Sequence, residues 1–195
     1  MNNKIKMVAY ISVFAALSIV LMMISIPVFF APNFYKIDLS DVPAILVAVI
    51  YGPFYGVLVE IIKIIVHCIL KGMSDYGIGA FANFLIGSIF VFTFGYTYRL
   101  LKLKFKMLIS SVLAVLMMVL VASLLNKYLL IPIYEKMFHL DVVSMGNKIN
   151  SSVNSMDTFI IFCVAPFNLL KASIESLIAV FLHKRIGQLF LGNNL

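Results

Sequence analysis

The chain alternates long apolar runs with short polar breaks. The apolar runs cover about residues 7–30, 42–51, 54–70, 80–98, 107–130 and 158–182. Most of them approach the roughly 20 apolar residues that a helix needs to cross a bilayer. The pattern predicts an all-α polytopic membrane protein with six transmembrane helices, folded as a single transmembrane domain over residues 1–195.

Composition supports this class. Hydrophobic residues make up 63% of the chain and charged residues 12%, and the mean hydropathy is +1.09, which lies far outside the range of soluble proteins. A chain of 195 residues with six spans has no room for a separate soluble domain. Any enzyme that supplies energy to this protein must therefore be another chain.

The run from Ala44 to Leu70 is interrupted at Gly52-Pro53, which is a turn or kink signal. The run is either one bent span or two short spans around a tight turn. Just before it, Ser40 or Asp41 can cap a helix and Pro43 suits a first helical turn. We therefore interpret the acids here as helix caps.

The basic residues favour two short spans. Six alternating spans place eight basic residues and no acid on one side: Lys4, Lys6, Arg99, Lys102, Lys104, Lys106, Lys184 and Arg185. The opposite side receives Lys36, Lys71, Lys127, Lys136 and Lys148. A single bent span would put the two basic surfaces on opposite sides. The side richer in Lys and Arg is the cytoplasmic one, so both termini are expected in the cytoplasm.

The last apolar run carries Asn168, Lys171 and Glu175 at positions i, i+3 and i+7, which share one helical face. An ionisable group at membrane depth costs roughly 2.5–3.5 kcal/mol on insertion scales, so it needs a partner or a cavity. We expect a buried polar site on this face. The alternative is a Lys171–Glu175 pair that only holds helices together.

A second polar stripe follows the Gly-Pro break, with Glu60, Lys63 and His67 at the same spacing. Because unpaired charges at this depth are costly, the charges of the two stripes are expected to pair, with their helices facing each other or a shared cavity. His67 reads as a polar residue near a helix end rather than as a ligand.

Several classes of site are not indicated. Cys68 and Cys163 are isolated in apolar runs without metal-ligand spacing. No Walker A sequence occurs, and no serine–base or paired-aspartate motif indicates an embedded enzyme. We expect no metal, no cofactor, no nucleic-acid partner and no catalytic activity.

Four motifs carry a resemblance to a known family. They are Lys36-Ile37-Asp38-Leu39-Ser40-Asp41-Val42-Pro43, Tyr51-Gly52-Pro53 with Gly56, Gly79-Ala80-Phe81-Ala82-Asn83-Phe84-Leu85-Ile86-Gly87-Ser88, and Pro166-Phe167-Asn168-Leu169-Leu170-Lys171. In order and spacing the chain resembles the riboflavin-specific substrate-binding (S) components of energy-coupling factor (ECF) transporters. The resemblance implies riboflavin uptake across the cell membrane, together with a membrane coupling (T) subunit and two cytoplasmic ABC ATPases.

Riboflavin has a flat ring system, a pyrimidine edge that donates and accepts hydrogen bonds, and a hydroxylated tail. Asn168 can donate and accept against such an edge, and Lys171 can donate. The remaining candidates are groups at loops and helix ends, namely Asp38, Asn83, Asn126 and Tyr134, and the second stripe residues Glu60 and Lys63. Asn83 either lines the cavity or bonds a neighbouring backbone.

Two further segments have open roles. Ser12 and Ala16 are small residues four apart, which lets another helix approach closely. This face packs inside the bundle or, as the resemblance implies for Ala9, Ser12 and Ala16, docks onto the coupling subunit. The mixed segment 135–157 is either a solvated linker or an amphipathic lid.

Two alternative functions compete with riboflavin uptake. The first is an S component for another vitamin: an intramembrane lysine also suits an anionic vitamin such as pantothenate or biotin, and a thiamine-like vitamin is a further alternative. A self-sufficient secondary transporter could instead relay protons through the charged stripes.

Overall fold

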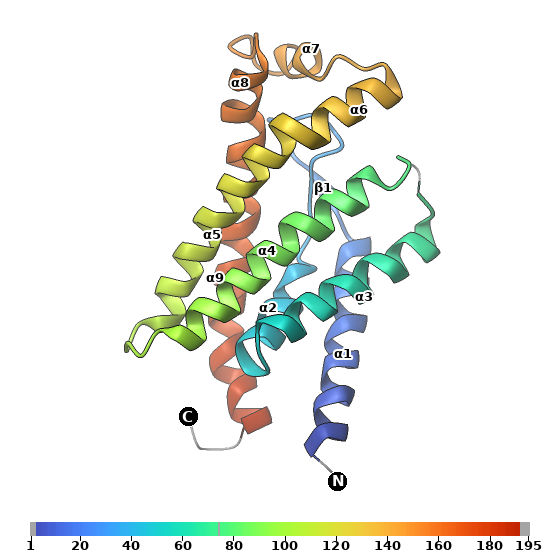
Figure 1. The fold of residues 1–195 in the computed structure, drawn as a ribbon. Coiled ribbons are helices and arrows are strands. Elements are labelled where there is room, and N and C mark those ends of the chain that lie inside the picture. The colour runs from blue at the N-terminus through green and yellow to red at the C-terminus, as the bar shows by residue number, and fades with distance from the viewer. Residues whose placement is uncertain (1–2, 74, 192–195) are drawn as a thin grey trace.

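The computed structural model describes residues 3–73 and 75–191. Within these residues, five helices are long and apolar enough to cross a membrane: Lys4–Met23, Pro53–Lys71, Ile78–Leu100, Lys106–Phe138 and Met156–His183. A shorter apolar helix, Asp41–Ile50, lies among them (Figure 1). The predicted all-α membrane class is confirmed, and each of the six apolar runs forms a helix.

The elements follow one another as α1 (Asn3–Met23), β1 (Ile26–Pro27), β2 (Lys36–Ile37), α2 (Asp41–Ile50), α3 (Pro53–Lys71), α4 (Ile78–Leu100), α5 (Lys106–Leu125), η1 (Asn126–Leu130), α6 (Ile131–Phe138), α7 (Val142–Asn147), α8 (Met156–Phe159), η2 (Ile160–Val164) and α9 (Ala165–Leu191). The η elements are π-helical turns.

Helix α2 forms the centre of the bundle. It packs against α1, α3, α4 and α9, and all its residues from Asp41 to Val49 are buried. A helix that is enclosed on every side must be apolar all round. Asp41 at its first turn is the one charged residue in the helix, so this carboxylate enters the core of the protein.

The turn between α2 and α3 is tight. Gly52 has a φ of +129°, a conformation that residues with a Cβ rarely adopt, and Pro53 starts α3. Gly56 brings the two helices close together, because a Cβ there would lie 2.6 Å from that of Ala48. The chain therefore makes two helices around a tight turn, as predicted, and not one bent span.

The first helix is shorter than predicted. It ends at Met23, whereas the apolar run continues to Phe30. Pro27 cannot donate a backbone hydrogen bond, and it disfavours the helical conformation at the residue before it. The chain instead forms an antiparallel hairpin in which Ile26 pairs with Ile37.

The fifth helix is longer than predicted. α5, η1 and α6 form one continuous helix from Lys106 to Phe138. The π turn closes with a bond from the Ile131 N–H to the Asn126 carbonyl, directly before Pro132. A wider turn accommodates the missing donor and the bulk of the proline ring, so the helix continues past it.

The last helix repeats this feature. α8, η2 and α9 follow one another directly, and the Ala165 N–H bonds the Ile160 carbonyl immediately before Pro166. The two π turns contact each other. The α5–α6 helix and the α8–α9 helix thus each contain a wider turn at the same level of the bundle, next to the residues described below as the site.

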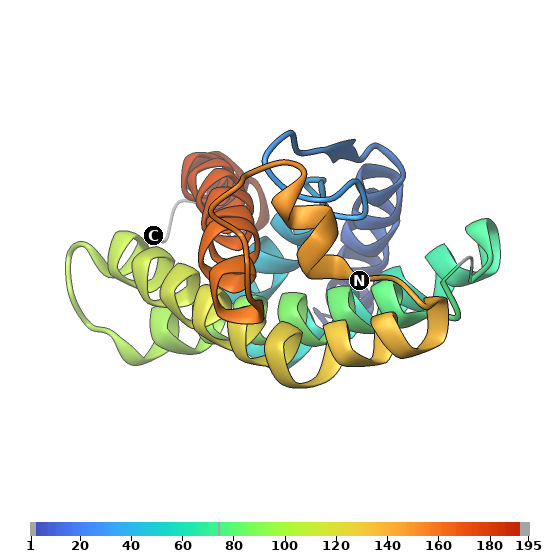
Figure 2. The same ribbon diagram turned by 90° about the horizontal axis from the view of Figure 1, so that it is seen from above.

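The mixed segment 135–157 is ordered and is not a solvated linker. Asp141 caps α7 by accepting a 2.9 Å bond from Ser144 N–H, and the Val142 N–H donates to Glu135. Val142 and Val153 are buried with Phe159 in a second hydrophobic core, which they share with residues of the hairpin, of α6 and of the last helix. Seen from above, α7 lies beside the upper part of the last helix and covers this end of the bundle (Figure 2).

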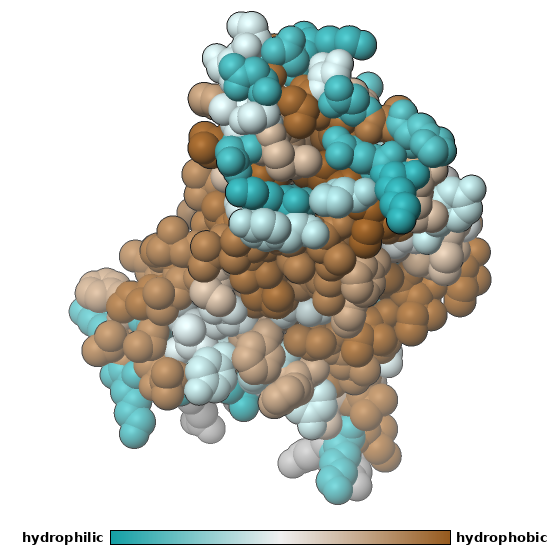
Figure 3. Space-filling model, turned by 45° about the horizontal axis from the view of Figure 1, so that its top comes forward, coloured by the Kyte–Doolittle hydropathy of each residue, from teal (hydrophilic) through white to brown (hydrophobic). Residues whose placement is uncertain are grey.

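The surface separates into zones. On the face shown, a broad apolar band crosses the middle of the bundle, with hydrophilic residues over the α6–α8 end and at the opposite tips (Figure 3). The start of α1, the end of α9 and the basic α4–α5 connection lie at the same end of the molecule (Figure 1). The zones match a protein that crosses the membrane several times.

Candidate functional site

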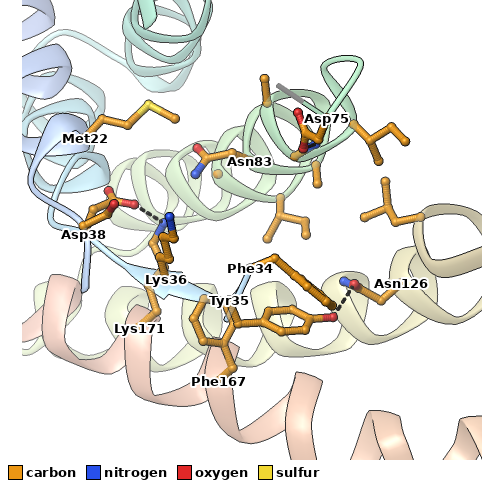
Figure 4. Close-up of a pocket in the computed structure, with 18 of the residues that line it drawn as sticks. Met22, Phe34, Tyr35, Lys36, Asp38, Asp75, Asn83, Asn126, Phe167 and Lys171 are labelled. Carbon is orange, nitrogen blue, oxygen red and sulfur yellow. Dashed lines mark hydrogen bonds and ion pairs between the residues drawn. The ribbon is translucent and has the colours of Figure 1, made fainter. Parts of the chain in front are cut away.

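A cavity of about 480 Å³ lies between the hairpin, the α3–α4 loop and the α4, η1, α6 and α9 helices. This volume falls within the range of about 300–1,000 Å³ that is usual for pockets that bind small molecules. Its lining combines aromatic rings, amide groups and charged groups (Figure 4).

The α9 stripe supplies two of the polar residues of the lining. Asn168 and Lys171 both line the cavity and are 2% and 4% exposed. The Asn168 amide donates to the Val164 carbonyl at 2.9 Å, one turn back. Its side-chain oxygen has no hydrogen-bond partner within residues 3–73 and 75–191, so it remains an acceptor for a ligand.

Lys171 meets the acidic turn that precedes α2. Its ammonium nitrogen is 3.4 Å from Asp38 Oδ2 and 3.6 Å from Asp41 Oδ2, and Figure 4 shows Asp38 and Lys171 together on one side of the cavity. The expected cap role is wrong for Asp41, because its carboxylate forms ion pairs inside the bundle. Asp38 accepts from the Ser40 N–H at 2.8 Å and faces Lys171 as well.

The α3 stripe is held by the same acidic turn. Lys63 Nζ lies 2.5 Å from Asp41 Oδ1 and 2.5 Å from Glu60 Oε2. Lys63, Glu60 and Asp41 are all buried. The two stripes therefore meet through Asp41 on α2, which packs between α3 and α9.

The alternative of a Lys171–Glu175 pair does not form. Lys171 pairs with the acids of the turn, and neither carboxylate oxygen of the fully buried Glu175 has a hydrogen-bond partner in the described part of the chain. The sequence pattern could not reveal this, because the competing acids are more than 120 residues away in the chain.

Aromatic rings form another part of the lining. Tyr35 packs against Phe34 and Phe167, with ring centroids 4.7 and 5.0 Å apart, and Phe34 packs against Tyr134 at 5.2 Å. The Tyr35 hydroxyl donates to Asn126 Oδ1 at 2.9 Å. Burial raises the pKa of the Tyr35 phenol, so it stays protonated as a donor.

Asn83 belongs to the cavity. It lines the cavity from α4, and its side-chain oxygen has no hydrogen-bond partner among the described residues. Figure 4 shows Asn83 across the cavity from Phe34 and Tyr35. Of the two roles that the sequence left open, the structure supports the cavity-lining one.

The structure brings six of the eight predicted substrate-binding residues to the cavity: Asp38, Asn83, Asn126, Tyr134, Asn168 and Lys171. Glu60 and Lys63 do not line it and lie behind Asp41. Residues that sequence reasoning missed are Phe34, Tyr35, Asp41 and Phe167. The Phe34-Tyr35 pair in a short loop, and a Phe directly before Asn168, were the available signals.

The face of α1 formed by Ala9, Ser12 and Ala16 points away from the bundle. All three residues are exposed, whereas Ala15 is buried. This face does not pack inside the protein, so it is free to meet another membrane helix. Docking through it stays a prediction.

Comparison with known proteins extends these observations. Residues 6–183 match the family model "ECF transporter, substrate-specific component". The chain is 30% identical to the riboflavin transporter FmnP of Bacillus subtilis (strain 168), over 90% of this chain and 88% of that protein. It is 29% identical to the riboflavin transporter RibU of Staphylococcus aureus (strain TCH60), over 91% of this chain and 88% of that protein.

A solved structure, described as the S component of a bacterial ECF transporter, has the same fold. The TM-score is 0.76 at 25% sequence identity, and the match covers 96% of this chain and 98% of that one. These relatives are transport proteins and not enzymes, and the matches do not favour a self-sufficient secondary transporter. The chain belongs to the family of substrate-specific components of ECF transporters.

Proposed function

We propose that this chain captures riboflavin in the cavity and delivers it through an ECF transporter. The observation that carries the proposal is the mixed lining of one cavity. Aromatic rings of Phe34 and Tyr35 suit a flat ring system, and Asn168 and Lys171 offer the donors and acceptor that a pyrimidine edge requires. The names of its relatives, riboflavin transporters, support the same ligand.

Different groups around the cavity are proposed to contact different parts of riboflavin. Asn168 presents a free acceptor beside the Lys171 ammonium, which suits the donor and acceptor sequence of the pyrimidine edge. Asn83 and Asn126 lie on other elements of the lining and suit the hydroxyls of the ribityl tail. Riboflavin is neutral, and the acids beside Lys171 disfavour an anionic vitamin at this position.

A titration of the purified chain tests the ligand. The wild-type protein in detergent is expected to quench flavin fluorescence on binding riboflavin and to ignore pantothenate and biotin. A colourless protein without quenching at any riboflavin concentration contradicts the substrate, while the family assignment would stand.

Transport also needs partners. We propose a membrane coupling subunit and two cytoplasmic ABC ATPases, with the exposed α1 face of Ala9, Ser12 and Ala16 as the docking surface. Vesicles that contain this chain alone are expected to bind riboflavin without accumulating it, and accumulation requires the coupling module and ATP. Accumulation driven by a proton gradient in vesicles with this chain alone contradicts this division of labour.

The proposed orientation places both termini in the cytoplasm. The basic α4–α5 connection lies at the same end of the bundle as the start of α1 and the end of α9, and the cavity is lined by the hairpin and the α3–α4 loop at the other end. A reporter fused after Arg185 and another near Lys104 are expected to report cytoplasmic. A reporter near Asn150 is expected to report the outside, and disagreement between the first two contradicts the orientation.

A further inference from the structure

A closed ring of polar contacts lies behind the cavity. Lys63 Nζ contacts Asp41 Oδ1 at 2.5 Å and the Ser40 hydroxyl at 3.1 Å. The Ser40 N–H donates to Asp38 Oδ1 at 2.8 Å. The other oxygens of Asp38 and Asp41 face Lys171 at 3.4 and 3.6 Å, which closes the ring.

The two lysines of this ring are held differently. Lys63 is fully buried, does not line the cavity, and has a second short contact with Glu60 at 2.5 Å. Lys171 lines the cavity, and its contacts are about 1 Å longer than those of Lys63. Hydrogen bonds between charged groups are normally about 2.7–2.9 Å. Lys171 therefore makes one long hydrogen bond, to Asp38 Oδ2 at 3.4 Å, and an ion pair with Asp41, and it keeps further N–H groups for a ligand.

The acidic turn connects these two lysines. Asp38 follows β2 and Asp41 begins α2, three residues further on, and each turns one oxygen towards Lys171. The other oxygens are engaged by Ser40 N–H and Lys63. The position of both carboxylates therefore depends on Lys63, which bonds Asp41 directly and the Ser40 hydroxyl beside it.

We propose that Lys63 is a positioning residue for ligand binding, and that Glu60 assists it. Lys63 holds the acidic turn in position. The carboxylates of that turn then hold the ammonium of Lys171 at the edge of the cavity. Glu60, which does not line the cavity, balances the charge of Lys63. A residue that never touches riboflavin thus sets its affinity, and this inference rests on the proposed function.

A double-mutant cycle tests the role. Lys63→Met is made alone and together with Lys171→Met, and riboflavin affinity is measured by flavin fluorescence. Lys63→Met is expected to weaken binding about 10-fold in the wild-type background and less than about 2-fold in the Lys171→Met background, because residues in one charge network are coupled. The visible absorption bands of bound flavin are expected to shift in the same direction in Lys63→Met and Lys171→Met.

Val59→Ala is the matched control. Val59 is fully buried on the same helix, next to Glu60, and has no polar contact with the turn. Val59→Ala is expected to lower the melting temperature of the unliganded protein and to leave both the riboflavin affinity and the spectrum of the bound flavin unchanged. A loss of affinity that follows the melting temperature across all variants contradicts a positioning role.

Glu60→Gln covers the case in which Lys63→Met does not fold. It keeps the shape of the side chain and removes the charge of the Lys63 partner, so a loss of about 2- to 5-fold is expected only while Lys171 is present. Equal losses with and without Lys171, or no loss, overturn the proposal. A wild-type chain that binds no riboflavin refutes the proposed function instead.

Discussion

The hydroxyl of Tyr35 donates a 2.9 Å hydrogen bond to Oδ1 of Asn126, 91 positions along the chain. Tyr35 precedes β2 in the hairpin, and Asn126 begins the π turn that follows α5. The Asn126 amide also donates to the Ala122 carbonyl at 2.8 Å, so its side chain is held at both ends. This pair fastens the hairpin to the wall of the cavity.

Tyr35→Phe removes this fastening. The buried Asn126 oxygen then lacks a donor, which costs about 1–3 kcal/mol. Thermal unfolding of the unliganded protein in detergent is expected to show this loss, together with weaker riboflavin binding. Tyr96→Phe, at a residue 52% exposed, serves as the control. A Tyr35→Phe protein as stable as the control contradicts the role of the bond.

Tyr35 also predicts a dependence of stability on alkaline pH. Burial raises the pKa of its phenol above the usual value, so above about pH 10 the unfolded chain loses this proton and the folded chain keeps it. The contribution to stability is complete below about pH 10 and is lost as the pH rises, by about 1.4 kcal/mol per pH unit. Melting curves from neutral to alkaline pH are expected to decline less steeply for Tyr35→Phe than for the wild type, and parallel declines contradict the assignment.

The sequence predicted the helices well because their signals are local. The apolar runs and the Gly52-Pro53 break each act within a few residues. Two helix ends, at Met23 and Phe138, differ from the prediction, and a proline is involved in both cases. Pro27 ends helical structure, whereas Pro132 is accommodated by a π turn, and the sequence around a proline does not reveal which of these will happen.

The site was predictable only in part. Asn168 and Lys171 could be located because a polar stripe in an apolar helix is conspicuous. Their partners could not, because Asp41 looks like a helix cap from its local sequence and becomes an ion-pair partner only when α2 lies between α3 and α9. The aromatic lining was missed for a related reason, since aromatic residues near the membrane surface are common.

The substitutions Glu175→Gln and Asp41→Asn compare the stability contributions of an unpaired and a paired buried carboxyl group. Glu175 is fully buried without a hydrogen-bond partner in the described residues. The isosteric amide breaks no hydrogen bond, so it is expected to change the free energy of unfolding by less than about 1 kcal/mol. Asp41→Asn breaks contacts with two lysines and is expected to cost about 3–5 kcal/mol. Thermal unfolding of both variants checks that Asp41→Asn is the more destabilising one. An equal loss of stability in the two variants contradicts this expectation.

Ala16→Leu tests the docking face. Ala16 is exposed on α1, and a larger side chain there keeps another helix from approaching closely. Co-purification with the coupling subunit is expected to fall while riboflavin affinity is unchanged. Ala15→Leu, on the buried side of the same helix, is expected to lower the stability of the chain itself. Should Ala16→Leu reduce affinity and co-purification equally, the face is not a docking surface.

The riboflavin affinity of Asn168→Ala tests the central claim most directly. Asn168 lines the cavity and keeps an acceptor available for the ligand, whereas the neighbouring Leu169 is 49% exposed and provides the control Leu169→Ala. Flavin fluorescence titration is expected to show a loss of about 5- to 150-fold for Asn168→Ala, with the melting temperature of the unliganded protein unchanged. Wild-type affinity in Asn168→Ala together with a lowered melting temperature would mean that the polar stripe only holds the helices together.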